Sequence, residues 1–423
     1  IPFYGIILDG DELHSVIFSS GNRDFFNSGY HNLMNQTTTA LEWKNQISVV
    51  NDFNLVKVWN DTLLFDVHPP LYHCILHVVF FLSGGSIVSA YLLNILFLLA
   101  SLHLISSKSQ RPYSSNWAVV AFLPFIINGC LDIRPYCVLF YLGLNAYFLL
   151  KEEKVALFKL AIVILLGLMT NYLFFIFIIA FVYARIGGGS FTIQLLKDNK
   201  SLLLCVLLTF ILGYVLLGQH NQVLNITNRV DFNRHFVFDK LTNVVFSLVG
   251  IIFPVWVYKL SNYLLLYLPL FGVGMLITVR FLRFFIRNKV KFSYEIRGLV
   301  LYLSAYMILY FLEVIPHHSV GGKYFLLLTI PVILPLMDML REYNKVKYLG
   351  ALSLILIISG EGLFRGDERH EISLMTNKKY SFYSNSNDVF TVLRIVNAMD
   401  DGKKIFIGAL PKDHGFDQLF ILN

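Results

Sequence analysis

The chain has 423 residues, of which 56% are hydrophobic and 14% are charged. Soluble domains have about 45–50% apolar and about 25% charged residues, so this composition indicates a membrane protein that crosses the bilayer several times. The formal net charge is +7, with the basic residues in short clusters between apolar runs. That arrangement is typical of cytoplasmic loops and disfavours nucleic acid as a partner.

The first part of the chain divides into a short apolar start and a long polar stretch. Residues 1–8 resemble the last turns of a helix, so we expect a first transmembrane segment to begin upstream of them. Residues 9–66 are polar, with apolar residues such as Trp43 and Trp59 at helical spacing. This pattern predicts a large first extracytoplasmic loop whose amphipathic helices lie along the membrane surface.

Two apolar runs follow, at residues 67–83 and 86–106. If both crossed the membrane, Lys108 and Arg111 would lie on the same side as the acidic first loop, against the positive-inside rule. The first run has about 17 residues, which is at the lower limit for a span. We therefore predict that it enters the membrane and returns on the same side, where surrounding protein can satisfy its backbone.

With that choice, the later apolar runs alternate between the two membrane faces and carry the basic clusters to the cytoplasm. Crossings are predicted at residues 86–106, 116–133, 134–150, 155–170, 171–184, 201–218, 262–279, 298–313, 323–340 and 346–360. A second extracytoplasmic loop is expected at 219–243, followed by a partial insertion at 244–258. The basic residues between Arg280 and Lys291 give the strongest orientation signal. The predicted fold class is an all-α polytopic membrane bundle.

After residue 360 the chain becomes more polar. Residues 389–398 predict a short amphipathic helix, and residues 404–408 predict a strand. We therefore divide the chain into a transmembrane domain at 1–360 and a small extracytoplasmic α/β region at 361–423.

The sequence predicts no metal-ligand set, although a need for a divalent cation stays open. The four cysteines lie inside apolar stretches without paired spacing, so we interpret them as buried apolar side chains. The adjacent residues His317 and His318 would point to different faces of a helix or strand, which disfavours a metal site there.

The predicted topology places acids, imidazoles and cations together at the extracytoplasmic face. They are Asp11, Glu12, Asp66, His68, Arg134, Asn171, His317, His318 and Lys323. Carboxylates suit a general base, and Arg and Lys suit a phosphate group. Simpler roles compete with these: the first-loop acids as solvated charges, His68 as a helix cap, and Arg134 as a side chain that reaches lipid phosphate without a substrate.

Five motifs follow one another along residues 9–340. They are Asp11-Glu12, Asp66-Val67-His68-Pro69-Pro70-Leu71-Tyr72, Arg134-Pro135-Tyr136, Gly167-Leu168-Met169-Thr170-Asn171-Tyr172, and Lys323-Tyr324 with Pro331. Together they resemble the GT-C superfamily of integral-membrane glycosyltransferases. The most similar branch is that of the dolichyl-phosphate-mannose protein mannosyltransferases (glycosyltransferase family 39) and their bacterial relatives, which include the lipid A aminoarabinose transferases.

The resemblance implies an inverting sugar transfer from a polyprenyl-phosphate donor to an acceptor at the extracytoplasmic face, with a first-loop Asp as general base. The acceptor would be a glycan, a lipid or a protein. The implied catalytic residues are Asp11, Glu12, Asp66 and His68. The implied donor-binding residues are Arg134, Tyr136, Asn171, His318, Lys323 and Tyr324.

The chain departs from the family pattern at two positions. Lys323 stands where an Arg is expected before Tyr, which weakens bidentate phosphate binding there. Asn171 stands where a His is frequent, so a role for that His is not inherited. Asp9 also competes with Asp11 as the base, and the residues alone do not separate the two.

Two other classes of membrane protein were weighed. An O-antigen polymerase or ligase generally carries its main loop late in the chain, whereas here the long loop comes first. A lipid-linked sugar transporter should show matched halves with polar residues at mid-membrane depth, and no such duplication is seen. The frequent Phe, Ile, Asn and Lys residues lean towards a low-GC bacterium, so we expect a multi-pass protein of the bacterial inner membrane with its site facing the exterior.

Overall fold

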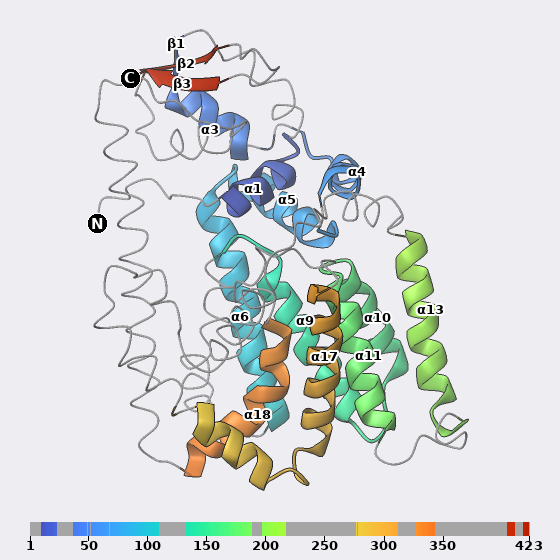
Figure 1. Cartoon of the computed structure of the whole chain (residues 1–423). Coiled ribbons are helices and arrows are strands. Elements are labelled where there is room, and N and C mark those ends of the chain that lie inside the picture. Colours follow the sequence, from blue (N-terminus) through green and yellow to red (C-terminus); the bar gives the residue numbers. More distant parts are fainter. Residues whose placement is uncertain are drawn as a thin grey trace.

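The computed structural model describes residues 10–22, 37–48, 50, 52–66, 68–109, 132–187, 197–216, 276, 278–311, 326–342, 404–410 and 418–422. Helices account for most of these residues, as their apolar runs predict. The elements fall into a bundle of long helices and a smaller group of short helices and strands at one end of it (Figure 1).

The bundle brings together long apolar helices from most of the chain. They are α6 (Ile87–Ser109), α9 (Tyr136–Lys151), α10 (Leu157–Leu168), α11 (Leu173–Ile186), α13 (Lys200–Leu216), α17 (Ser293–Phe311) and α18 (Leu326–Glu342). Helix α9 lies at the centre, in contact with α6, α10, α11 and α18, and nearly all its side chains are buried.

Glycines allow close helix packing in the bundle. A Cβ atom at Gly298 of α17 would overlap the ring of Phe181 on α11, and one at Gly143 of α9 would overlap Ile330 of α18. Only a residue without a side chain lets these backbones and side chains approach so closely. The bundle core is therefore tightly packed where α17 meets α11 and where α18 meets α9.

The group of short elements contains α1 (Gly10–Ser20), α3 (Ala40–Ser48), α4 (Leu55–Phe65) and α5 (Leu71–Ser83). Helix α1 packs on α5 and α4, and α5 in turn packs on α6. Helix α5 has 13 residues and ends at Gly84, whose φ of 64° is readily adopted by glycine. Helices α1, α3 and α4 lie within residues 9–66, where the sequence predicts helices, and α5 lies within the apolar run at 67–83.

A three-stranded antiparallel sheet joins the two ends of the sequence (Figure 1). Its strands are β1 (Thr37–Thr39), β2 (Lys404–Leu410) and β3 (Gln418–Leu422), in the order β1-β2-β3. Thr37 pairs with Phe406, which pairs on its other side with Leu422. The predicted strand at 404–408 is confirmed and extends to Leu410, whereas the predicted helix at 389–398 lies outside the described residues.

Within the described part of the chain, one helix is long and apolar enough to cross a membrane, from Ile87 to Lys108 of α6. Six other apolar helices are shorter. The structure confirms a mostly helical chain. The runs predicted at 116–133, 219–243, 244–258, 262–279 and 346–360 lie wholly or largely outside the described residues.

Candidate functional site

The connection between α4 and α5 places Asp66 and His68 at the mouth of an apolar helix. Asp66 ends α4, and its backbone N–H donates to the carbonyl of Thr62 at 3.0 Å. Pro69 and Pro70 then lead into α5, with Pro70 at the N-cap position. Because proline has a fixed φ and no backbone donor, it suits this entry and limits how the loop can lie.

Asp66 is buried, with 3% of its side chain exposed, and imidazoles surround it. His68 Nδ1 lies 3.1 Å from its Oδ1, and His73 Nε2 lies 3.0 Å from its Oδ2. His14 Nδ1 lies 3.8 Å from the same Oδ2. The three imidazoles come from α5, the α4–α5 connection and α1. We call Asp66, His14, His68 and His73 the Asp66 cluster.

The cluster keeps Asp66 ionised. Burial alone would raise the pKa of the Asp66 carboxyl, but the charge and hydrogen bond of His68, the hydrogen bond of His73 and the charge of His14 together hold this pKa well below its usual value. A carboxylate with so low a pKa is a weak base. Asp66 is therefore better suited to orient imidazoles than to accept a proton itself.

His14 is kept neutral. Burial, together with the charges of Arg134, His73 and His68 and against the opposing effect of Asp66, lowers the pKa of its imidazole to about 4. At pH 7 the ring of His14 therefore carries no net charge. About a quarter of this side chain is exposed, at 26%, compared with 12% for His68. These two rings are the most exposed members of the cluster.

A second set of hydrogen bonds holds the imidazoles of α5 against α1. His73 Nδ1 lies 3.1 Å from Ser19 Oγ, and His77 Nδ1 lies 2.7 Å from the carbonyl of Ser19. The backbone N–H of Asn54 donates to His77 Nε2 at 3.1 Å. Because Nε2 of His77 accepts, its Nδ1 must carry the proton and donate to Ser19.

Glu12 is fully enclosed and ties three segments together. Its Oε1 accepts from the hydroxyl of Tyr91 and from the backbone N–H of Ile133, both at 3.1 Å. Close by, the side-chain amide of Asn94 donates to the carbonyl of Asp132 at 2.5 Å. These bonds fix α1 and α6 to the segment that begins α9, which is a structural use of the Glu12 carboxylate.

Arg134 follows this anchored segment and lies at the edge of the Asp66 cluster. Its side chain is buried, at 4% exposed. Its charge reaches His14 strongly enough to lower the pKa of that imidazole. Tyr136, which begins α9 after Pro135, is also buried. The fixed position of Ile133 beside Glu12 thus brings a guanidinium to the same end of the bundle as the buried carboxylates.

The turn between α10 and α11 borders the same region. Asn171 is buried, and its Oδ1 accepts from the backbone N–H of Leu173 at 2.9 Å, which shapes the turn locally. The carbonyl of Met169 accepts from the backbone N–H of Leu71 at 2.9 Å and joins this turn to the start of α5. Tyr172 is close enough to Asp66 for the two side chains to interact electrostatically.

The structure thus brings six of the predicted site residues to one end of the bundle: Glu12, Asp66, His68, Arg134, Tyr136 and Asn171. The backbone of Asp11 lies in α1 next to Glu12, but its side chain lies outside the description. His318, Lys323 and Tyr324 also lie outside the described residues.

Sequence reasoning missed His14, His73 and Ser19. A signal for His73 was present, because His73 and His77 are four residues apart on an apolar helix and so share one face. His14 lies three residues after Asp11, which places it on the same side of α1 as that acid. Ser19 has no comparable signal, since its role depends on the packing of α1 against α5.

Among the residues that the structure describes, no group of three or more His, Cys, Asp or Glu side chains is arranged to hold a metal ion. The three imidazoles instead point to the oxygens of one carboxylate. No family model, curated protein or solved structure matches this chain.

Proposed function

We propose that this chain is an integral-membrane glycosyltransferase that moves a sugar from a polyprenyl-phosphate donor to an acceptor. The observation that carries the proposal is the buried Asp66 cluster with Arg134 at its edge, at one end of an apolar helical bundle. Such a site offers proton-handling groups and a cation for a phosphate, which are the two requirements of this reaction. The motif resemblance described above points to the same reaction.

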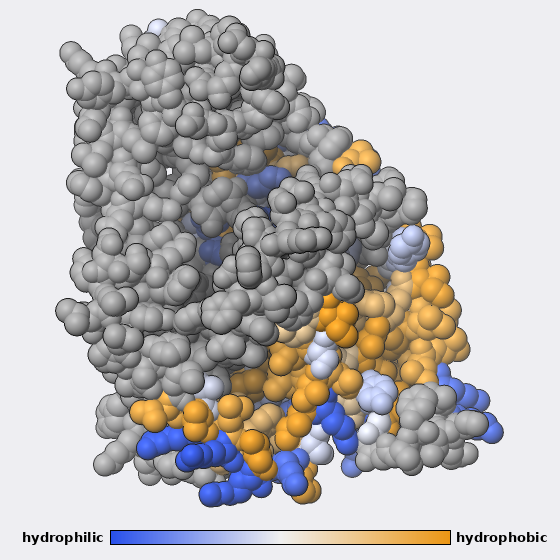
Figure 2. Space-filling model, viewed as in Figure 1, coloured by the Kyte–Doolittle hydropathy of each residue, from blue (hydrophilic) through white to orange (hydrophobic). Residues whose placement is uncertain are grey.

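The outer surface of the bundle supports a membrane location. Figure 2 shows apolar side chains gathered where α11, α13 and α17 lie, and hydrophilic ones at the end where α17 begins. Soluble monomers rarely expose apolar patches larger than a few hundred Å². On α6 and α13 the exposed large apolar residues are Val88, Leu92, Ile95, Leu96, Leu99, Leu204, Leu207, Leu208, Ile211, Leu212, Tyr214 and Val215.

The orientation follows from charge. The basic residues between Arg280 and Lys291 lie at the end of the bundle opposite to α1 and α5 (Figure 1). By the positive-inside rule that end faces the cytoplasm, so the Asp66 cluster faces the exterior. We place the protein in a bacterial inner membrane with its site on the outer face, which is where a lipid-linked sugar donor meets external acceptors.

In the proposed reaction, the acceptor oxygen forms a bond to the anomeric carbon on the face opposite to the breaking bond to phosphate. The acceptor proton passes to a first-loop carboxylate, which we assign to Asp11. The departing polyprenyl phosphate is already anionic, and Arg134 would steady its charge, together with Lys323. Asp66 would hold His68 and His14 in place to bind the sugar, since its low pKa makes it a poor base.

An assay of the purified chain in lipid nanodiscs with a panel of radiolabelled polyprenyl-phosphate sugars tests the proposal. We expect transfer with at least one donor. Asp11→Asn should abolish transfer while donor binding survives, because an amide cannot accept the proton. Lys154→Ala, on the exposed α9–α10 connection, is the matched control and should keep the wild-type rate.

Retained turnover in Asp11→Asn would show that Asp11 is not the base. Asp9 would then be the candidate, and loss of transfer in Asp9→Asn would test that assignment. Arg134→Gln should weaken donor binding, by about 1.5–3 kcal/mol for a lost charged hydrogen bond. Donor binding equal to wild type in that variant would contradict the phosphate-binding role of Arg134.

A further inference from the structure

A cavity lies at the opposite end of the bundle from the Asp66 cluster (Figure 1). It has a volume of about 360 Å³ and lies between α6, α9 and α10. Asn94, which belongs to the first site, and Lys108, which lines this cavity, are 14 residues apart on α6, or about 21 Å at 1.5 Å per residue. The cavity is therefore distinct from the first site.

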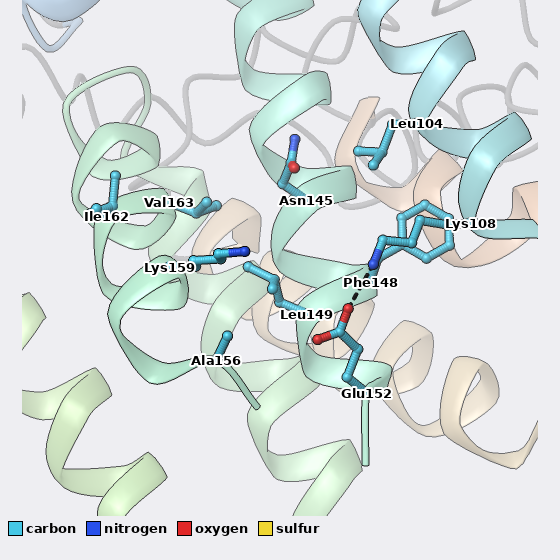
Figure 3. A pocket seen from close by; sticks show the side chains of 10 residues that line it. All are labelled: Leu104, Lys108, Asn145, Phe148, Leu149, Glu152, Ala156, Lys159, Ile162 and Val163. Carbon is cyan, nitrogen blue, oxygen red and sulfur yellow. Dashed lines mark hydrogen bonds and ion pairs between the residues drawn. The ribbon is translucent and has the colours of Figure 1, made fainter. Parts of the chain in front are cut away.

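The cavity has a polar rim and an apolar wall (Figure 3). Lys108 and Lys159 are its cations, and Glu152 is its acid. Phe148 forms part of a buried wall, and Ile162, which is 43% exposed, continues that wall to the outer surface of α10. A ligand that fits this arrangement has an anionic head and an apolar tail.

The charges of the rim do not cancel. Lys108 Nζ forms an ion pair with Glu152 Oε1 at 2.7 Å. Lys159 forms no ion pair with any residue that the structure describes, so the rim carries one more cation than acid. Figure 3 shows the Lys159 side chain directed into the cavity, towards the side that Lys108 occupies.

The floor of the cavity is held in place from a neighbouring helix. Arg185 of α11 donates to the carbonyls of Leu150, Glu152 and Glu153, the last at 2.9 Å. These bonds fix the α9–α10 connection, which carries Glu152 and leads to the first turn of α10. The cavity is thus preformed, which reduces the entropy lost when a ligand binds.

We infer that this cavity binds the phosphate headgroup of an anionic phospholipid, with the acyl chain lying along the apolar side of α10. Lys108 lies at the end of the helix long enough to cross a membrane, so the rim is at the depth where lipid headgroups lie. Basic pockets between transmembrane helices on the cytoplasmic side are known to hold such headgroups. This inference rests on the membrane location alone and not on the chemistry of the Asp66 cluster.

The test uses the full chain in phosphatidylcholine nanodiscs, with native mass spectrometry after addition of phosphatidylglycerol. Lys159→Ala should lower phosphatidylglycerol binding about fivefold, which corresponds to the loss of one cation near a headgroup. Glu152→Gln should raise it by a similar factor, because Lys108 is then no longer neutralised. Lys154→Ala, outside the cavity, should leave binding unchanged.

Opposite effects of Lys159→Ala and Glu152→Gln cannot come from a general loss of folding. Equal phosphatidylglycerol binding by wild type and Lys159→Ala would overturn the inference. So would efficient displacement of the lipid by millimolar glycerol 3-phosphate, since the cavity would then be a site for a soluble phosphate. These outcomes do not depend on whether sugar transfer is observed.

Discussion

The two ends of the bundle each contain a buried carboxylate, and they differ in what surrounds it. The imidazoles of His68 and His73 lie within hydrogen-bond distance of Asp66, and that of His14 lies nearby. Glu295, which is 2% exposed, is bonded by Lys151 Nζ at 2.6 Å and by the hydroxyl of Tyr147 at 2.7 Å. One end therefore surrounds its carboxylate with imidazoles, and the other has an ion pair that holds helices together.

This difference shows that burial of an acid does not by itself identify a reactive site. Lys151 and Glu295 join α9 to α17, and Lys291 and Asp338 join the residues before α17 to α18 at 2.6 Å. The partners of Asp66 are instead imidazoles, from α1, α5 and the α4–α5 connection. What differs is the chemistry of the partners: an imidazole nitrogen can donate or accept a hydrogen bond, whereas a lysine ammonium can only donate.

The largest expected effect comes from Asp66→Asn. The amide would not hold the imidazoles as the carboxylate does, so we expect the transfer rate to fall by at least about 100-fold, since loss of a carboxylate that orients an active-site imidazole can cost more than this. The matched variant at the other end is Glu295→Gln. It should lower stability by about 1–2 kcal/mol, between the values for exposed and for fully buried ion pairs, and leave the transfer rate near wild type.

Radiolabel transfer and thermal unfolding of both variants give the comparison directly. If Glu295→Gln lost activity as severely as Asp66→Asn while remaining folded, the distinction between the two ends would be wrong.

The next largest effect is a pH dependence of folding stability that comes from His14, at the Asp66 end of the bundle. His14 has an ordinary pKa of 6.5 and a pKa of about 4 in the fold. Between these values the unfolded chain binds a proton that the folded chain does not, so stability is complete above pH 6.5 and falls towards pH 4. At pH 5 the loss from His14 should be about 2 kcal/mol.

His14→Gln should remove this part of the loss, as measured by thermal unfolding in detergent at pH 7.5 and pH 5. Asp66 does not interfere in that range. Its contribution to stability is lost only as the pH falls below the ordinary pKa of the carboxyl towards its lower pKa in the fold. His103→Gln, at an exposed position on α6, is the control and should follow wild type. An unchanged pH profile in His14→Gln would count against a neutral, buried His14.

The smallest effect is expected from Gly298→Ala, three residues after Glu295 on α17. The added methyl group would overlap the ring of Phe181, so we expect a loss of about 1 kcal/mol in stability and an unchanged transfer rate. Phe181→Leu in the same chain should recover part of the loss by making room. A loss of activity without a loss of stability would contradict a purely structural role for this end.

Much of the helical fold could be predicted from the sequence. The apolar runs at 134–150, 155–170, 171–184 and 201–218 correspond to α9, α10, α11 and α13, because long apolar stretches satisfy their backbone groups most simply as helices. Pro135 marks the start of α9, and Gly187 marks the end of α11. The pairing of β1 with β2 could not be predicted, since it joins residues more than 360 positions apart.

The sequence by itself determined that Asp66 and His68 lie at the entrance of α5, because two prolines and a change from polar to apolar residues are local features. Only the tertiary structure decided that His14 and His73 lie beside one carboxylate, and that Glu12 accepts hydrogen bonds from Tyr91 and Ile133. It also decided that the pKa of Asp66 is low, which makes this carboxylate a weak base. The physical reason is that pKa values and hydrogen-bond partners depend on burial and on neighbours from distant segments, which no local pattern records.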